Sequence, residues 1–80
     1  MRHPITYEQT GGEGGDAVVA EWLVKIGDQV SQGQAVVEVD VDKVITEIAA
    51  PETGLLVQID IEVDEPVLPG QVLGYIESEN

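Results

Sequence analysis

The ten residues Glu38-Val39-Asp40-Val41-Asp42-Lys43-Val44-Ile45-Thr46-Glu47 decide the fold that this sequence predicts. Apolar residues alternate with acids before Asp42, and two distinct faces continue after Lys43, which is the period typical of half-buried strands. We therefore expect a hairpin with Asp42 and Lys43 as its two turn residues. Its facing pairs on the core side would be Val41 with Val44, Val39 with Thr46, and Val37 with Ile48.

Two features of this hairpin are energetically unfavourable. A two-residue turn requires positive φ, which Asn-Gly or Asp-Gly adopts more easily than Asp42-Lys43. The same register sets Glu38 directly opposite Glu47, and like charges at opposed positions repel. A chain that accepts both costs can be keeping Lys43 for chemistry. The simpler interpretation, which this stretch alone favours, is a solvated hairpin end whose lysine discourages edge-to-edge aggregation.

The composition describes one small acidic domain. Eighty residues carry 16 acids and three basic side chains, for a net charge of −13. This balance argues against binding to nucleic acid or anionic membranes and fits a protein that meets basic partners. There is no cysteine for a disulfide or a thiolate metal site, and no apolar run approaches membrane-spanning length. We expect a single domain over residues 1–80, with a core at about 12–77 and a linker or tail beginning at 78–80.

Short strands separated by turns are predicted along the rest of the chain. The expected strands are Ile5–Glu8, Ala17–Ile26, Leu55–Val63 and Val72–Ile76, with Gly-rich residues 11–16 as a loop. In the third of these strands, alternate residues should share the core face, namely Leu55, Val57, Ile59 and Ile61. No segment shows a helical period. Seven or eight short strands predict an all-β sandwich or flattened β-barrel.

The chain also repeats itself at an offset of 37 residues. Val30-x-x-Gly33-Gln34-x-Val36-x-x-Val39 matches Val67-x-x-Gly70-Gln71-x-Leu73-x-x-Ile76. Each half is too small to bury its own apolar face, so we expect the two halves to pack about a pseudo-twofold axis. The offset makes Lys43 in the first half equivalent to Asn80 in the second half. The sequence therefore predicts that Lys43 lies at the other end of the domain from both termini.

Catalytic and metal sites are not supported by the remaining side chains. His3 is the only histidine and lies near a terminus, so no nucleophile–base–acid set can be assembled. Trp22 stands among strand valines and matches Ile59 in the repeat, which favours a core or half-buried position over a stacking platform. We expect a protein that is not an enzyme and binds no metal.

Five segments in order carry a family resemblance. They are Gly12-Glu13-Gly14, Trp22-x-Val24-Lys25-x-Gly27-Asp28-x-Val30, Glu38 to Val44 with Glu47, Ala50-Pro51-x-x-Gly54, and Val67-x-x-Gly70-Gln71-x-Leu73. Over roughly residues 12–77 the chain resembles lipoyl domains of the acyltransferase (E2) components of 2-oxo acid dehydrogenase complexes. It departs from them in lacking the apolar-Pro-x-x lead-in directly before Gly12-Glu13-Gly14 and in having Val41 where threonine is common. The resemblance implies a flattened barrel of two four-stranded antiparallel sheets.

The resemblance also implies a function. Lys43 would carry lipoic acid in amide linkage, and Asp42 and Val44 would present it to a lipoate ligase or lipoyl transferase. The swinging arm would serve a thiamin-diphosphate decarboxylase (E1), the E2 catalytic domain and dihydrolipoamide dehydrogenase (E3), in a bacterial or archaeal cytoplasm or a mitochondrial matrix. The acids Glu38, Asp40 and Glu47 would steer the domain toward basic partner surfaces.

Two alternatives stay open from the sequence. A biotin carrier shares the implied fold and the Ala-Pro-x-x-Gly segment at residues 50–54, but usually places methionines beside its lysine, where this chain has Asp42 and Val44. An unmodified β-domain would act as an interaction module, with Lys43 as an ordinary surface lysine.

Overall fold

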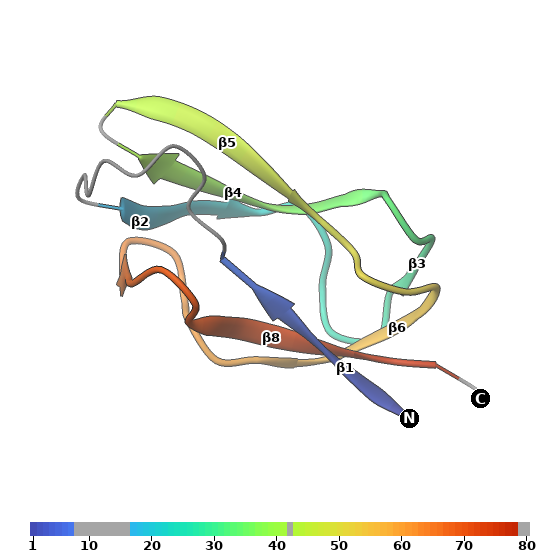
Figure 1. Cartoon of the computed structure of the whole chain (residues 1–80). Coiled ribbons are helices and arrows are strands. Elements are labelled where there is room, and N and C mark those ends of the chain that lie inside the picture. Colours follow the sequence, from blue (N-terminus) through green and yellow to red (C-terminus); the bar gives the residue numbers. More distant parts are fainter. Residues whose placement is uncertain (8–16, 42, 79–80) are drawn as a thin grey trace.

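The computed structural model describes residues 1–7, 17–41 and 43–78, and these form two antiparallel sheets of four strands each that pack face to face (Figure 1). One sheet has the strand order β1-β8-β6-β3 and the other β5-β4-β2-β7. The strands are β1 (Arg2–Thr6), β2 (Ala17–Trp22), β3 (Gln29–Val30), β4 (Ala35–Val41), β5 (Val44–Ala49), β6 (Gly54–Ile59), β7 (Pro66–Val67) and β8 (Val72–Glu77). The predicted all-β class with two four-stranded sheets is confirmed.

The part of the chain that the structure describes contains no helix able to span a membrane. The Gly-rich loop and the turn residue Asp42, both named by the sequence analysis, lie outside the described residues.

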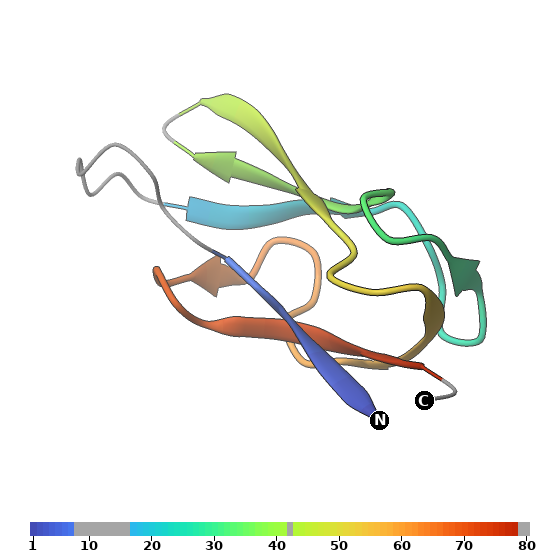
Figure 2. The same cartoon turned by 45° about the vertical axis from the view of Figure 1, so that its right-hand side comes forward.

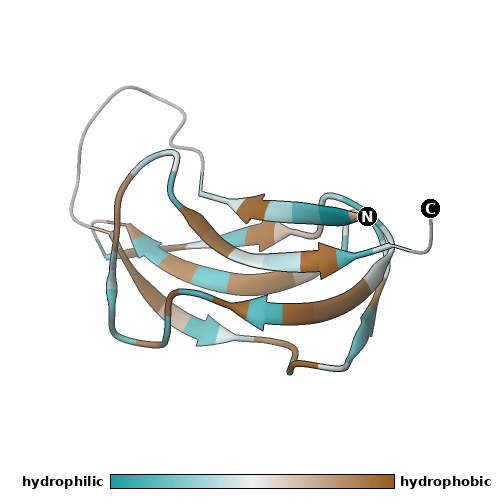
Figure 3. Ribbon diagram, turned by 90° about the horizontal axis from the view of Figure 1, so that it is seen from below, coloured by the Kyte–Doolittle hydropathy of each residue, from teal (hydrophilic) through white to brown (hydrophobic). Residues whose placement is uncertain are grey.

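The core lies between the two sheets and is apolar throughout. Hydrophobic and hydrophilic residues alternate along the strands, as Figure 3 shows by colour. No charged side chain among the described residues is buried, so no charge has to be compensated inside the core. The largest fully buried side chains are Ile5, Leu56, Leu73, Ile76, Val19, Val30, Val36, Val37 and Val39.

The β4–β5 hairpin has the register that the alternation predicts. Its pairs include Val41 with Val44, Val39 with Thr46, Val37 with Ile48, and Glu38 with Glu47. The expected pairing is therefore confirmed, including its like-charge pair. Val37 and Val39 are fully buried, whereas Val44 is 64% exposed because the hairpin extends past the end of the opposing sheet.

The internal repeat is also confirmed, because it relates the two sheets strand by strand. Shifting β2 by 37 residues gives the bounds of β6, and the same shift takes β3 to β7 and the start of β4 to the start of β8. The two four-stranded sheets thus have equivalent strand orders, with β5 and β1 as the corresponding outer strands. This equivalence is the pseudo-twofold relation expected from the sequence.

Turn hydrogen bonds repeat with the same offset. The amide of Ser31 donates to Gln34 Oε1 at 3.0 Å, and the amide of Leu68 donates to Gln71 Oε1 at 2.9 Å. The glycines between them, Gly33 and Gly70, have φ of 87° and 85°. Such angles suit glycine, which has no Cβ to clash. The Gly-Gln pairs of the repeat therefore specify two equivalent turns.

Several strand boundaries differ from those predicted. β1 begins at Arg2 rather than Ile5, because Pro4 is tolerated on an outer strand where no neighbour needs its amide. β2 ends at Trp22 rather than Ile26, since the chain turns at residues 25–28, where the amide of Asp28 donates to the carbonyl of Lys25 at 2.9 Å. β6 covers Gly54–Ile59 rather than Leu55–Val63, since the chain turns at residues 62–65, where the amide of Glu65 donates to the carbonyl of Glu62 at 3.1 Å.

The predicted core face of β6 is wrong at its first residue. Leu56 is fully buried, and Leu55, which was expected inside, is 45% exposed. The pairing of β6 with β8 shifts between Leu56 and Gln58, so one extra residue is inserted there and the alternation changes phase. Beyond this bulge Ile59 packs against the core as expected.

The turn end of the β4–β5 hairpin lies at the opposite end of the molecule from the start of β1 and the end of β8 (Figures 1 and 2). The start of β1 and the end of β8 are adjacent because the two strands pair along their length. The ammonium of Met1 donates to the carbonyl of Ser78 at 3.0 Å, and the amide of Ser78 donates to the carbonyl of Met1 at 2.9 Å. The position predicted for Lys43 relative to the termini is confirmed.

Candidate modification site at the β4–β5 hairpin

Lys43 occupies the turn that joins β4 to β5. Its φ is 68°, which is the left-handed conformation that a two-residue hairpin turn demands. A lysine in this conformation places its Cβ close to the backbone, an arrangement that costs roughly 1–2 kcal/mol. The unfavourable turn geometry predicted from the sequence is therefore present at Lys43. Its neighbour Asp42 lies outside the described residues.

The side chain of Lys43 is exposed, and the two residues that follow it are exposed and apolar. Val44 is 64% and Ile45 51% exposed. Within the described ranges, no hydrogen bond or ion pair holds the Lys43 amine, and the one salt bridge joins Arg2 Nε to Glu77 Oε1 at 3.9 Å on the other sheet. The amine is therefore accessible to a second protein and has room to extend once it is acylated.

Glu38 and Glu47 belong to a longer row of carboxylates on the outer face of the second sheet. Glu38 pairs with Glu47 on one side and with Glu21 on the other, so three glutamates stand side by side across β5, β4 and β2. Asp40 lies in the adjacent row, between Ile45 and Val18. Sequence reasoning identified Glu38, Asp40 and Glu47 but missed Glu21. Local alternation cannot reveal Glu21, because its place depends on the pairing of β2 with β4.

The other candidate side chains have structural partners. Trp22 is half-buried against the core, and its Nε1 donates to the carbonyl of Ile61 at 2.8 Å. The predicted core or half-buried position of Trp22 is confirmed. Lys25 is exposed in the turn at residues 25–28, where its amide donates to Asp28 Oδ2 at 2.9 Å. No group of three or more His, Cys, Asp or Glu among the described residues is arranged to hold a metal ion.

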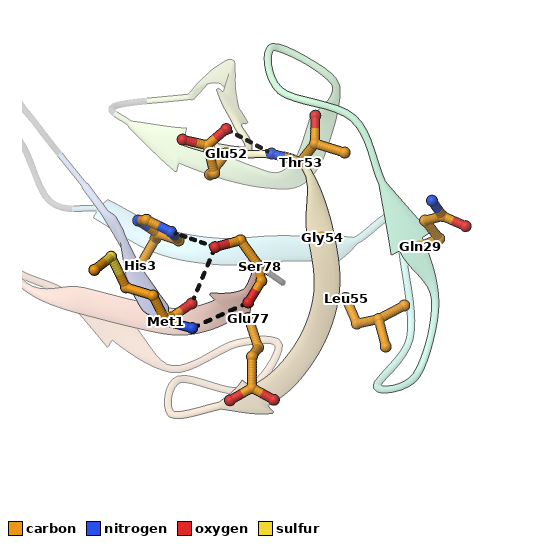
Figure 4. A pocket seen from close by; sticks show the side chains of 9 residues that line it. All are labelled: Met1, His3, Gln29, Glu52, Thr53, Gly54, Leu55, Glu77 and Ser78. Carbon is orange, nitrogen blue, oxygen red and sulfur yellow. Dashed lines mark hydrogen bonds between the residues drawn. The ribbon is translucent and has the colours of Figure 1, made fainter. Parts of the chain in front are cut away.

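A pocket lies at the terminal end, remote from Lys43 (Figure 4). His3 Nε2 is 2.9 Å from Ser78 Oγ there, and the amide of Thr53 donates to Glu52 Oε1 at 3.3 Å. His3, near the start of β1, thus contacts Ser78, which directly follows β8. The pocket is lined by Met1, His3, Gln29, Glu52, Thr53, Gly54, Leu55, Glu77 and Ser78.

Comparison with known proteins identifies the family. The Biotin_lipoyl family, described as "Biotin-requiring enzyme", matches residues 4–76. The dihydrolipoyllysine-residue succinyltransferase component of the 2-oxoglutarate dehydrogenase complex of Buchnera aphidicola subsp. Baizongia pistaciae is 42% identical over 61 residues, which are 76% of this chain and 15% of that protein. The dihydrolipoyllysine-residue acetyltransferase component of the pyruvate dehydrogenase complex of Mycobacterium bovis is 40% identical over 73 residues, 91% of this chain and 13% of that protein.

A solved structure agrees with these relatives. The lipoyl domain of the 2-oxoglutarate dehydrogenase complex from Azotobacter vinelandii superposes with a TM-score of 0.72 at 27% identity, covering 95% of this chain and 99% of that one. The chain spans less than a fifth of each of the two acyltransferases and nearly the whole of the isolated lipoyl domain. The chain therefore belongs to the Biotin_lipoyl family and is a non-catalytic carrier domain of the lipoyl type.

Proposed function

We propose that Lys43 carries a lipoyl group in amide linkage. The observation that supports this most strongly is the position of Lys43, an exposed lysine at φ 68° in a hairpin turn at the opposite end of the domain from the termini. A tether attached at the termini would leave this end free to enter other active sites. Lys25, the other lysine, lies in the 25–28 turn and has no such hairpin.

The chemical role proposed for Lys43 is to provide an amine for covalent attachment. Its deprotonated amine would attack the carbonyl of a nucleotide-activated lipoate, forming an amide bond as the nucleotide leaves and the nitrogen loses a proton. The amide is uncharged, so the former ammonium becomes part of a long flexible arm. When bound, the lipoyl dithiolane supplies the acyl-accepting and two-electron chemistry that a chain without cysteine lacks. The chain itself contributes the exposed hairpin end that holds this arm clear of the sheets.

The proposed partners are those of an acyltransferase chain. A thiamin-diphosphate decarboxylase would load the arm, the catalytic domain of the acyltransferase would unload it onto coenzyme A, and the flavoprotein dihydrolipoamide dehydrogenase would reoxidise it. Tethering raises the effective concentration of the arm at each site, to the millimolar range for short flexible linkers. The proposed compartment is accordingly a bacterial or archaeal cytoplasm or a mitochondrial matrix.

The residues around Lys43 would serve recognition. Asp42 and Val44 flank the lysine and would present it to the modifying enzyme. Glu38, Asp40 and Glu47 share the outer face of the same hairpin and would attract basic surfaces over about a Debye length, roughly 8–10 Å at physiological salt.

The biotin carrier is the second candidate, because the matching family includes proteins described as biotin-requiring. The residues beside Lys43 favour lipoate, since Asp42 and Val44 replace the methionines usual in biotin carriers. An unmodified interaction module is the remaining alternative.

Intact mass separates these three possibilities. We expect the chain to gain one lipoyl group when incubated with a lipoate ligase, ATP and lipoate, and to gain nothing with a biotin ligase, ATP and biotin. Lys43→Ala abolishes the gain, whereas Lys25→Ala, the matched control, retains it. A biotinyl increment, no increment, or an increment that survives in Lys43→Ala contradicts the proposal.

A further inference from the structure

The four outer strands of the described sheets differ in how open they are to another strand. β3 and β7 contain two residues each, too few to guide a long pairing. β1 carries Pro4, which lacks an amide hydrogen. β5 runs for six residues from Val44 to Ala49, contains no proline and has one charged residue, Glu47. β5 is therefore the open sheet edge among the described strands.

The pairing of β5 shows which of its backbone groups are free. Residues next to a two-residue turn exchange both hydrogen bonds, so Val44 bonds to Val41 and the pattern alternates along the strand. The amides and carbonyls of Ile45 and Glu47 consequently point away from β4. β1 is the strand that corresponds to β5, and its paired residues Met1 and Ser78 correspond to Val44 and Val41. Counting along β1 from Met1, the residue that corresponds to Glu47 is Pro4.

The side chains at this edge favour a basic strand. A fifth strand, added to this sheet beside β5, would place one side chain next to Glu47 and extend the row of Glu21, Glu38 and Glu47. A lysine or arginine there would oppose three carboxylates, whereas an acid would add to their repulsion. Two residues along, the neighbour would face Ile45, which is 51% exposed and apolar.

A second copy of this chain is a poor occupant for the edge. Each copy carries a net charge of −13, and pairing two β5 strands would bring two glutamate rows together. The protein that modifies the lysine fits better, because Ile45 lies only two residues from Lys43. A strand paired there would fix the approach to Lys43, while Lys25 lies in a turn without a free strand edge.

We propose that the enzyme that acylates Lys43 docks on the outer edge of β5 with an extended segment that bonds to the backbone of Ile45 and Glu47 and places a basic residue beside Glu47. This inference rests on the proposed function, since it names how the modifying enzyme recognises the site. The pairing would distinguish Lys43 from Lys25 by backbone geometry, and the glutamate row would select a basic segment.

The test compares three substitutions at one position by the rate of lipoylation with a lipoate ligase, ATP and lipoate. Glu47→Ala removes the charge alone, Glu47→Lys reverses it, and Glu47→Pro also removes the outward amide. The proline at the corresponding site of β1 indicates that the fold accepts the last change. We expect kcat/KM to fall at least tenfold for Glu47→Pro and Glu47→Lys, with Glu47→Ala between these and wild type.

Two controls keep the outcomes distinct. Glu77→Lys makes the same charge change at an exposed position on β8, in the other sheet, and is expected to leave kcat/KM within twofold of wild type. Acylation of Lys43 by a small amine-reactive ester, together with the urea midpoint, checks that each variant is folded with its lysine exposed. Hydrogen exchange of Lys43→Ala mixed with the ligase should show new protection at the amides of Ile45 and Glu47.

Each result then supports or overturns the inference. A folded Glu47→Pro variant modified as fast as Glu47→Ala overturns the strand pairing, as does unchanged exchange at residues 45 and 47 in a mixture that binds. Equal rates for Glu47→Lys and wild type overturn the basic segment. A wild-type chain that takes no lipoyl group overturns the proposed function and this inference with it. If the wild type is lipoylated and the Glu47 variants have the same kcat/KM as wild type, only the inference is overturned.

Discussion

Lys43 is held in a backbone conformation that a lysine adopts only at a cost. Apart from glycine, the described residues with positive φ are Lys43 at 68° and Asp64 at 72°. Asp64 corresponds to Gly27 in the repeat, and aspartate tolerates this conformation better than lysine does. The penalty at Lys43 is thus the larger of the two, and glycine would remove it. The chain has a lysine at this position although glycine would make the folded domain more stable.

Replacing Lys43 by glycine should therefore stabilise the domain while removing its proposed attachment site. We expect Lys43→Gly to raise the free energy of unfolding by about 1 kcal/mol, because glycine has no Cβ to clash at positive φ. Urea unfolding followed by Trp22 fluorescence measures this change. Lys25→Gly removes the same side chain at ordinary φ and is expected to give no gain. If the two variants are equally stable, the conformation of Lys43 carries no strain.

At the scale of strands, the contact between Trp22 and Gly74 breaks the symmetry of the two sheets. Trp22 pairs with Val37 across β2 and β4, while the equivalent pair across β6 and β8 is Ile59 with Gly74. A Cβ placed on Gly74 would lie 3.2 Å from the Trp22 ring and would collide with the carbonyl of Gln58. The absence of a side chain at Gly74 thus provides room for the large ring on the opposite sheet.

This packing predicts that Gly74→Ala is destabilising. We expect the free energy of unfolding to fall by about 1–3 kcal/mol, since overfilling a packed core forces neighbouring groups to shift. Urea unfolding followed by circular dichroism measures the change. The loss should be smaller in a Trp22→Ile background, which gives β2 the residue that β6 has at Ile59. An equal loss in both backgrounds would assign the effect to the Gln58 carbonyl alone.

The strands also show where local patterns are insufficient. The register of β4 and β5 follows from alternation, because Val37, Val39 and Val41 never change phase. β6 could not be assigned in this way, since its bulge moves the buried position to Leu56. The repeat does contain that information. Leu56 matches Val19, which is fully buried, so the first half of the chain predicts the second better than the period of two does.

For the whole molecule, the repeat relates each strand of one sheet to a strand of the other. β2, β3 and β4 relate to β6, β7 and β8 by 37 residues, and β5 relates to β1 by 43 residues, from Val44 back to Met1. Met1 and Ser78 therefore occupy the positions of Val44 and Val41, and their two backbone hydrogen bonds match a pair at the base of a hairpin turn.

A circular permutant tests whether Met1 and Ser78 can flank a turn as Val44 and Val41 do. Joining Asn80 directly to Met1 would make a two-residue loop between β8 and β1, and opening the chain between Gly14 and Gly15 leaves all eight strands whole. We expect the permutant to fold with the same strand pairs and a similar urea midpoint, as checked by two-dimensional NMR and denaturation. An added four-residue linker at the same junction is the control. If only the longer linker folds, the end-to-end match is incomplete.

The sequence by itself determined the hairpin, its turn lysine, the all-β class and the twofold repeat. These features depend on alternation and spacing, which act between neighbours along the chain or between its two similar halves. Only the tertiary structure decided that Glu21 joins Glu38 and Glu47, that Trp22 lies over Gly74, and that β5 has an open edge. Such contacts join residues far apart in sequence, and they exist only once the strands have paired and the sheets have packed.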